Sequence, residues 1–286
     1  MTSTIGLVLH PRRNCAEAMQ TITSWARERQ IEVLGLPDEV GRAGRSVTAV
    51  GPDELSRRAD VIVGLGGDGT ILRALRLTLE DRTPVLGVNL GRLGFLAEID
   101  IPELGGALTS IVEGRFTIET RSGLRAIAGE RSAVAFNDVA VVRIPSDGMS
   151  AVGLRVEGHT FVRYSADAVV VSTPTGSTAY SFSAGGPIVS PSAEGLLVIP
   201  VAPHSAFNRA LFLSTGEKLC LEILPTSGEL AVEADGRPVG RAHPGDLIDI
   251  DVLPGAAQLV RLGGTTFYQR AQRKLRLTGS AEVETD

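Results

Sequence analysis

A short loop of glycines around one aspartate is the first feature of this sequence that could carry out chemistry. Residues Gly66 to Thr70 read GGDGT, between an apolar run that ends at Leu65 and a segment with helical spacing. Glycines let a backbone turn sharply and approach a phosphate, and a following helix points N–H groups at an anion. Because a carboxylate repels phosphate, Asp68 needs a separate role. It could take a proton from an attacking hydroxyl, help to hold a metal ion, or cap the helix.

A second candidate site is a loop rich in hydroxyl groups that follows the apolar run Val169 to Val171. Residues Ser172 to Tyr180 read STPTGSTAY, and Ser181 to Pro187 read SFSAGGP. Small hydroxyl residues with glycine and proline form a rigid loop with many short donors and acceptors. Such a loop can seat a nucleotide base and sugar, and the alternative is a hydroxyl-rich surface turn.

Other common catalytic motifs are missing from the sequence. No HExxH spacing, GxSxG elbow or Walker A motif occurs, which argues against zinc hydrolysis, acyl transfer and P-loop chemistry. The histidines and cysteines are scattered, at His10, His159, His204, His243, Cys15 and Cys220.

The first third of the chain alternates strand-like and helix-like segments, so it predicts an α/β domain with a parallel, doubly wound sheet. Ligands of such sheets bind at the carboxyl ends of the strands, where the GGDGT loop stands. The predicted strands are Ile5 to Leu9, Ile31 to Leu34, Asp60 to Leu65 and Val85 to Val88, and the predicted helices are Cys15 to Ala26 and Thr70 to Glu80.

From about Phe116 the pattern changes to short alternating runs, which predict a mostly antiparallel β domain. Ile248, Ile250 and Val252 share one face of a half-buried strand. The predicted strands are Leu124 to Ala128, Val134 to Val142, Gly153 to Val156, Thr160 to Val162, Val169 to Val171, Lys218 to Leu224, Leu230 to Ala234, Leu247 to Val252 and Gln258 to Leu262. A helix from Phe267 is expected to return to the first domain. The expected domains are therefore 1–115 with 265–286, and 116–264.

Composition narrows the class of protein. The 286 residues carry a formal net charge of -5, which speaks against a nucleic-acid binder. Two distant cysteines fit a reduced, cytoplasmic compartment, and we expect neither a signal peptide nor a membrane span. The polar tail after Leu277 is expected to be disordered.

Together the two loops resemble the bacterial NAD kinase family, in a superfamily with diacylglycerol kinases, sphingosine kinases and phosphofructokinases. GGDGT is shared widely there, whereas STPTGSTAYSFSAGGP is more specific because the lipid kinases lack it. Further similar segments occur in the expected order. They are NLGRLGFLAEID at Asn89 to Asp100, FNDV at Phe136 to Val139, PHSAFNRAL at Pro203 to Leu211, and EADGRP at Glu233 to Pro238.

The resemblance implies an enzyme that transfers the γ-phosphate of ATP to the adenosine 2′-hydroxyl of NAD, giving NADP and ADP, with Asp68 as the catalytic base. It implies that Gly66, Gly67, Gly69 and Thr70 contact phosphate, that Phe95 and Leu96 lie near the dinucleotide, and that Asn137 and Asp138 bind the adenosine ribose. It further implies that Asp167 contacts the nicotinamide amide, that Thr175, Thr178, Ala179 and Tyr180 surround the adenine and diphosphate, and that Asp235 lies near the nicotinamide ribose.

The sequence departs from the family at two of these positions. The family often has Glu at the position of Asp138. The aspartate of this chain is one methylene shorter and keeps the carboxylate. The family commonly has Gly where Ala168 stands, and alanine fits there if the backbone does not need a positive φ.

The resemblance also implies NAD and ATP, or polyphosphate, as substrates, and a homodimer or homotetramer. Mg²⁺ or another divalent cation is expected to come with ATP, without a protein-built metal cage. No nucleic acid and no membrane are expected as partners. Two alternatives remain open: a lipid kinase of the diacylglycerol kinase type, and an NAD(P)-binding sensor without catalysis.

Overall fold

The computed structural model describes residues 2–43, 46–91, 94–145 and 147–277, and these residues form two compact units. Unit 1 comprises Met1–Thr120 and Ala257–Asp286, and unit 2 comprises Arg121–Ala256. The chain therefore leaves unit 1, builds unit 2 and returns. The predicted polar tail after Leu277 lies outside the described residues. No helix within the described ranges has the length and apolar character needed to cross a membrane.

Unit 1 is an α/β unit with a mostly parallel sheet, as predicted. Its strands run parallel in the order β3-β2-β1-β4-β5. Its elements are β1 (Thr4–Leu9), α1 (Ala16–Glu28), β2 (Glu32–Gly35), α2 (Pro37–Ala43), β3 (Thr48–Ala49), α3 (Pro52–Arg58), β4 (Val61–Leu65), α4 (Asp68–Leu77), β5 (Val85–Asn89), β6 (Ile99–Asp100), the 3₁₀ helix η1 (Ile101–Glu103), α5 (Leu104–Val112) and α7 (Phe267–Leu275).

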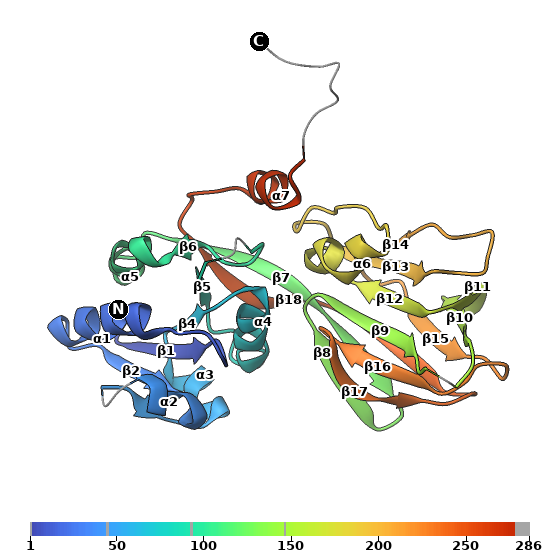
Figure 1. The fold of residues 1–286 in the computed structure, drawn as a ribbon, viewed down its shortest axis with the longest axis horizontal. Helices are drawn as coiled ribbons and strands as arrows, with labels where there is room; N and C mark the ends of the chain where they lie inside the picture. The colour runs from blue at the N-terminus through green and yellow to red at the C-terminus, as the bar shows by residue number, and fades with distance from the viewer. Residues whose placement is uncertain (1, 44–45, 92–93, 146, 278–286) are drawn as a thin grey trace, which may run out of the picture. The chain divides into compact units, whose positions relative to one another are not determined.

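Alternating side chains of these strands pack on the two faces of the sheet. Ile5, Leu7, Val63 and Val88 pack against α1 and α5 on one face, which Figure 1 shows beside each other. On the other face α4 packs closely on the sheet, because a Cβ added to Gly87 of β5 would lie 2.6 Å from Ile71 Cδ1 of α4. The missing side chain at Gly87 thus allows α4 to approach the sheet, with its N-terminus at the end of β4.

Unit 2 is a β-sandwich, so the predicted antiparallel fold is confirmed. One sheet has the order β14-β13-β12-β9-β16-β17, and the other part of the unit contains β11-β10-β15-β18 with β7 and β8. The elements are β7 (Thr117–Ala128), β8 (Arg131–Ala135), β9 (Asp138–Arg143), β10 (Ser150–Val156), β11 (His159–Ala166), β12 (Ala168–Ser172), the 3₁₀ helix η2 (Thr175–Thr178), α6 (Tyr180–Ser183), β13 (Gly195–Val201), β14 (Leu211–Ser214), β15 (Leu219–Ile223), β16 (Leu230–Ala234), β17 (Arg237–Ala242) and β18 (Leu247–Arg261).

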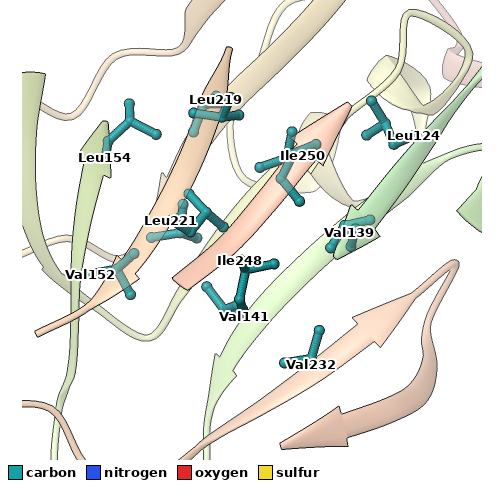
Figure 2. Close-up of a cluster of buried hydrophobic side chains, with 14 of the residues drawn as sticks. Leu124, Val139, Val141, Val152, Leu154, Leu219, Leu221, Val232, Ile248 and Ile250 are labelled. Carbon is teal, nitrogen blue, oxygen red and sulfur yellow. The ribbon is translucent and has the colours of Figure 1, made fainter. Parts of the chain in front are cut away.

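The core of unit 2 lies between its two sheets. Figure 2 shows Val141 of β9 beside Ile248 of β18, in one cluster with Val139 of β9 and Leu221 of β15. The alternation predicted for Leu247 to Val252 is confirmed, since Ile248 and Ile250 are buried while the intervening aspartates are exposed.

Two predicted strand boundaries are wrong. The run Val134 to Val142 is not one strand, because it breaks at Phe136–Asn137 between β8 and β9. The runs Leu247 to Val252 and Gln258 to Leu262 are not separate, because β18 continues through Gly255, which has a φ of 57°. Glycine adopts a positive φ without strain, so the strand passes through Gly255, where a turn would also have been compatible with the sequence.

Candidate functional site

In unit 1 the GGDGT loop lies at the point where the sheet changes winding direction. β1 has β2 on one side and β4 on the other, and α1 and α4 cover opposite faces of the sheet. In doubly wound sheets the crevice beyond the carboxyl ends at this switch point is where ligands bind. Gly66 to Thr70 join β4 to the first turn of α4. The first N–H groups of a helix lack acceptors within it, and in this turn Thr70 donates to the Gly67 carbonyl at 2.9 Å. This arrangement suits a phosphate group.

The Asp68 carboxylate does not cap α4, so that hypothesis is wrong. Gly67 is the N-cap residue and no side chain accepts a capping bond there. Instead Asp68 turns toward the segment after β5. Its Oδ2 accepts a hydrogen bond from the Phe95 backbone N–H at 3.1 Å, and its Oδ1 accepts one from the Leu96 N–H at 3.0 Å. The two residues predicted near the dinucleotide thus hold the predicted base through their backbone.

The fit around Asp68 is tight and includes a cation. A Cβ added to Gly94 would lie 2.2 Å from Asp68 Oδ1, so no other residue fits at this position without displacing the carboxylate. Lys274 of α7 donates to Asp68 Oδ2 at 2.9 Å. Sequence reasoning singled out neither Gly94 nor Lys274. Lys274 stands 206 residues from Asp68, and no local pattern signals a contact at that separation.

In unit 2 the break between β8 and β9 is held by an aspartate from a distant hairpin. Asp235 and Gly236, with φ of 50° and 68°, form the two-residue turn between β16 and β17. Positive φ at both central residues is typical of a type I′ turn, for which Asp-Gly is a preferred sequence. The Asp235 carboxylate accepts hydrogen bonds from the backbone N–H groups of Phe136 at 3.0 Å and Asn137 at 2.7 Å.

Thr173 connects this break to the hydroxyl-rich loop. Its Oγ1 donates to the Phe136 carbonyl at 2.6 Å and accepts from the Gly176 N–H at 2.9 Å, while its N–H donates to the Asn137 carbonyl at 2.8 Å. The side chain is fully buried. We did not assign Thr173 a role from the sequence, although it lies in the quoted motif. The hydroxyl-rich loop is therefore packed against Asn137, and the surface-turn alternative is wrong for its buried first half.

After Thr173 the loop winds through η2 into α6, which lies beside β12 (Figure 1). Thr175 is buried, whereas Thr178, Ala179 and Tyr180 are partly exposed. The Tyr180 ring packs on Ala140, Val170 and Ile199 on the outer face of the sheet. This places the four predicted adenine and diphosphate contacts along a single short turn.

Carboxylates surround the phenol of Tyr180. Burial is the main cause that raises the pKa of Tyr180, and the negative charges of Glu233, Asp138 and Asp167 raise it further. Asp167 itself is half exposed and pairs with Arg143 at 3.0 Å. Its neighbour Ala168 is a residue of β12 and is not among those with positive φ, so the alanine is compatible with the local backbone.

Asp138 has the most perturbed carboxyl group of the candidate site. Burial raises its pKa to about 7, the charges of Asp235 and Glu233 act in the same direction, and a hydrogen bond from the Tyr180 backbone N–H opposes them. A carboxyl whose pKa is raised by burial and by neighbouring negative charges is typical of functional sites.

The structure thus gathers the predicted residues into two sets. Unit 1 holds Gly66, Gly67, Asp68, Gly69, Thr70, Phe95 and Leu96, and unit 2 holds Asn137, Asp138, Asp167, Thr175, Thr178, Ala179, Tyr180 and Asp235. Among the described residues no group of three or more His, Cys, Asp or Glu side chains is arranged to hold a metal ion.

Comparison with known proteins identifies the family. The model of the ATP-NAD kinase N-terminal domain matches residues 5–116, and that of the C-terminal domain matches residues 136–262. The chain belongs to the ATP-NAD kinase family. An NAD kinase is a phosphotransferase, so the family is one of enzymes.

Individual members of the ATP-NAD kinase family match over nearly the whole chain. NAD kinase 1 of Streptomyces avermitilis is 36% identical, and the match covers 99% of this chain and 89% of that protein. NAD kinase of Desulforamulus reducens is 37% identical, over 96% of this chain and 97% of that protein.

Two solved structures are similar in fold. The NAD kinase of Archaeoglobus fulgidus in complex with ATP is 27% identical with a TM-score of 0.75, covering 96% of this chain and 100% of that one. Yeast NADH kinase complexed with NADH has a TM-score of 0.86 at 24% identity, covering 99% of this chain and 90% of that one. The yeast structure supports the fold alone.

Proposed function

We propose that the protein is an ATP-dependent NAD kinase, which transfers the γ-phosphate of ATP to the 2′-hydroxyl of the adenosine ribose of NAD and releases NADP and ADP. The observation that carries this proposal is the Asp68 carboxylate, held by two backbone N–H groups beside a helix N-terminus that suits phosphate. Phosphoryl transfer depends mainly on positioning and on charge stabilisation, and both are built into this loop.

In the proposed reaction Asp68 accepts the proton of the 2′-hydroxyl. The hydroxyl oxygen forms a bond to the γ-phosphorus, the bond from that phosphorus to the bridging oxygen breaks, and ADP leaves with the electron pair. Gly66, Gly67, Gly69 and Thr70 are proposed to contact the phosphates. The N–H groups of Gly66 and Thr70 already donate to the carbonyls of Val88 and Gly67, so those of Gly67 and Gly69 are the proposed donors to phosphate oxygens. Phe95 and Leu96 fix the base through their backbone and lie beside the dinucleotide.

The dinucleotide would be bound by the second set of residues. We propose that Asn137 and Asp138 bind the adenosine ribose, and that Thr175, Thr178, Ala179 and Tyr180 contact the adenine and diphosphate. Burial and hydrogen bonding of Asp138 beside Tyr180 support this assignment. Asp167 would contact the nicotinamide amide, and Asp235 would lie near the nicotinamide ribose while it holds Asn137 in place.

Mg²⁺ or another divalent cation is proposed to enter with ATP as part of the substrate. The Asp68 carboxylate already accepts hydrogen bonds from two N–H groups and an ammonium group. The phosphates of ATP are therefore better ligands for the cation than Asp68 is.

We further propose a cytoplasmic homo-oligomer, a dimer or a tetramer. Edge strands provide surfaces for association. Phe161 on β11 and Phe212 on β14 are 55% and 44% exposed on strands at sheet edges, which supports this proposal. Light scattering after size-exclusion chromatography would measure the mass in solution.

The test of the proposed activity is NADP formation from NAD, ATP and Mg²⁺, read with an NADP-specific dehydrogenase. Asp68→Asn keeps the shape of the side chain and removes the base, so kcat should fall at least about a hundredfold, the low end for a positioned general base. Asp81→Asn, at an exposed position after α4, is the matched control and should keep wild-type kcat. Binding of NADP without any turnover in the wild type would favour the sensor instead.

A further inference from the structure

The carboxylate of Asp68 accepts three hydrogen bonds from the protein. Oδ2 accepts from the Phe95 N–H and from Lys274 Nζ, whereas Oδ1 accepts from the Leu96 N–H. A carboxylate offers about four lone-pair positions, two on each oxygen. Oδ2 is therefore saturated, and one position on Oδ1 remains for the hydrogen of an acceptor hydroxyl.

Lys274 reaches this carboxylate because α7 is fixed at several points. Thr266 and Gln269 form a capping box at the start of the helix. The buried Arg270 donates to the carbonyls of Phe95 at 3.4 Å and Ala97 at 2.6 Å, and it pairs with Glu98. The helix is thereby bonded to the same segment whose N–H groups hold Asp68.

The Phe95 ring provides a second contact for the ammonium group. Lys274 Nζ lies 4.4 Å from the centroid of that ring, a distance at which a cation is attracted to the aromatic face. The Phe267 ring of α7 lies 6.0 Å from the Phe95 ring and supports it from the helix. The Asp68 carboxylate and the Phe95 ring thus hold the ammonium group, and the Lys274 side chain remains about one-third exposed.

We propose that Lys274 is a positioning residue of the phosphoryl transfer, which aligns the Asp68 carboxylate so that Oδ1 faces the acceptor hydroxyl. The inference rests on the proposed kinase function. An ammonium ion has three N–H donors, and one of them bonds Asp68. The positive charge of Lys274 therefore lies beside the Asp68 carboxylate, which receives the proton on Oδ1. In the proposed reaction the negative charge of the transferring phosphoryl group develops near the same place.

In this arrangement the proton moves from the ribose hydroxyl to Asp68 Oδ1, the new oxygen–phosphorus bond forms, and the bond to the ADP oxygen breaks. Lys274 exchanges no proton and keeps its charge throughout. Its loss should therefore lower kcat and leave the binding of NAD and ATP nearly unchanged, because the residue orients the base and does not itself hold the dinucleotide.

The experiment compares Lys274→Met, Lys274→Arg and Lys274→Ala with the wild type by kcat, by KM for NAD and by KM for ATP. We expect kcat to fall 10- to 100-fold in Lys274→Met, with both KM values within threefold of the wild type. Lys274→Arg should recover at least a fifth of wild-type kcat, since it restores the charge with a different geometry. Added ethylamine should raise kcat of Lys274→Ala severalfold by supplying the missing ammonium.

Arg273→Met is the matched control, because it removes one positive charge from the same turn of α7. Arg273 lines a cavity of about 410 Å³ with Asp100 and Glu103, and Asp68 is not among the residues that line it, so kcat of Arg273→Met should be that of the wild type. Circular dichroism and thermal unfolding of each variant report whether α7 remains folded.

Three results would overturn the inference. They are a kcat of Lys274→Met within twofold of the wild type, an equal loss in Arg273→Met, or a loss that neither arginine nor ethylamine restores. If the wild type makes NADP and any of these results is found, the kinase function stands and the role of Lys274 is wrong. If the wild type makes no NADP, the proposed function itself fails.

Discussion

The substitution Gly94→Ala tests how closely the Asp68 carboxylate is positioned. The added Cβ would lie 2.2 Å from Oδ1 and 2.9 Å from Cγ of Asp68. An ordinary carbon contact is about 3.5 Å, so the carboxylate must retreat by about 1 Å. The bonds from Phe95, Leu96 and Lys274 oppose this movement, because a retreat of the carboxylate would disturb the hydrogen bonds to both of its oxygens.

Misplacing a catalytic group by about 1 Å can cost roughly a hundredfold in rate, so we expect Gly94→Ala to lower kcat by about that factor. The assay is NADP formation with saturating NAD and ATP. Gly105→Ala makes the same chemical change within α5, where an added Cβ meets no atom within 4 Å, and it should leave kcat unchanged.

A double-mutant cycle decides whether Gly94→Ala acts through Asp68. If it does, adding Gly94→Ala to Asp68→Asn should lower kcat little further, because the base has already been lost. A folded Gly94→Ala variant with more than a third of wild-type kcat would refute the reasoning. So would a full hundredfold loss on top of Asp68→Asn.

Three further substitutions test the surroundings of the two loops. Gly176→Ala would bring a Cβ to 2.0 Å from the Asn137 carbonyl oxygen, so KM for NAD should rise at least tenfold in steady-state assays. Because the pKa of Asp138 is raised to about 7, its carboxylate is ionised above that pH and accepts hydroxyl hydrogen bonds best there. Calorimetry should show NAD binding more tightly at pH 8 than at pH 6, and Asp138→Asn should remove this difference. Glu98→Gln would leave the buried Arg270 without its anion and should lower the free energy of unfolding by about 3–5 kcal/mol, measured with urea.

Each of these expectations has a control or a contrary result. Gly240→Ala, whose added Cβ has its nearest neighbour at 3.6 Å, should leave KM unchanged, and equal effects of the two glycine variants would contradict the role of Gly176. A pH dependence that persists in Asp138→Asn would assign it to another group. Wild-type stability of Glu98→Gln would show that the ion pair with Arg270 contributes nothing to the fold.

Local patterns predict much of the fold, because periodicity reports which side chains are buried. The alternation around Ile248 and the helical spacing of Ile22 and Trp25 both predict burial that the structure has. The periodic pattern does not predict a strand break where distant residues, instead of a neighbouring strand, bond the backbone. The break at Asn137 lies inside an apolar run, and it exists because Asp235 and Thr173 bind its backbone.

The residues of the candidate site likewise include some that the sequence predicts and some that it does not. Asp68 was recognisable from its neighbours, since an acid inside a glycine loop is chemically unusual. Gly94 and Lys274 were not, because their importance lies in atoms that approach Asp68 from other parts of the chain. Arg270 reads as one more charge on an exposed helix, and only the folded structure reveals its buried bonds to Phe95 and Ala97.

The discontinuity of unit 1 sets the order of events during biosynthesis. Residues 121–256 must be translated before Ala257 and α7 can leave the ribosome. At about 5–20 residues per second this takes on the order of 10 s. Throughout that interval Asp68 has already been synthesised and Lys274 has not. The nascent chain can therefore complete the surroundings of Asp68 only when α7 emerges.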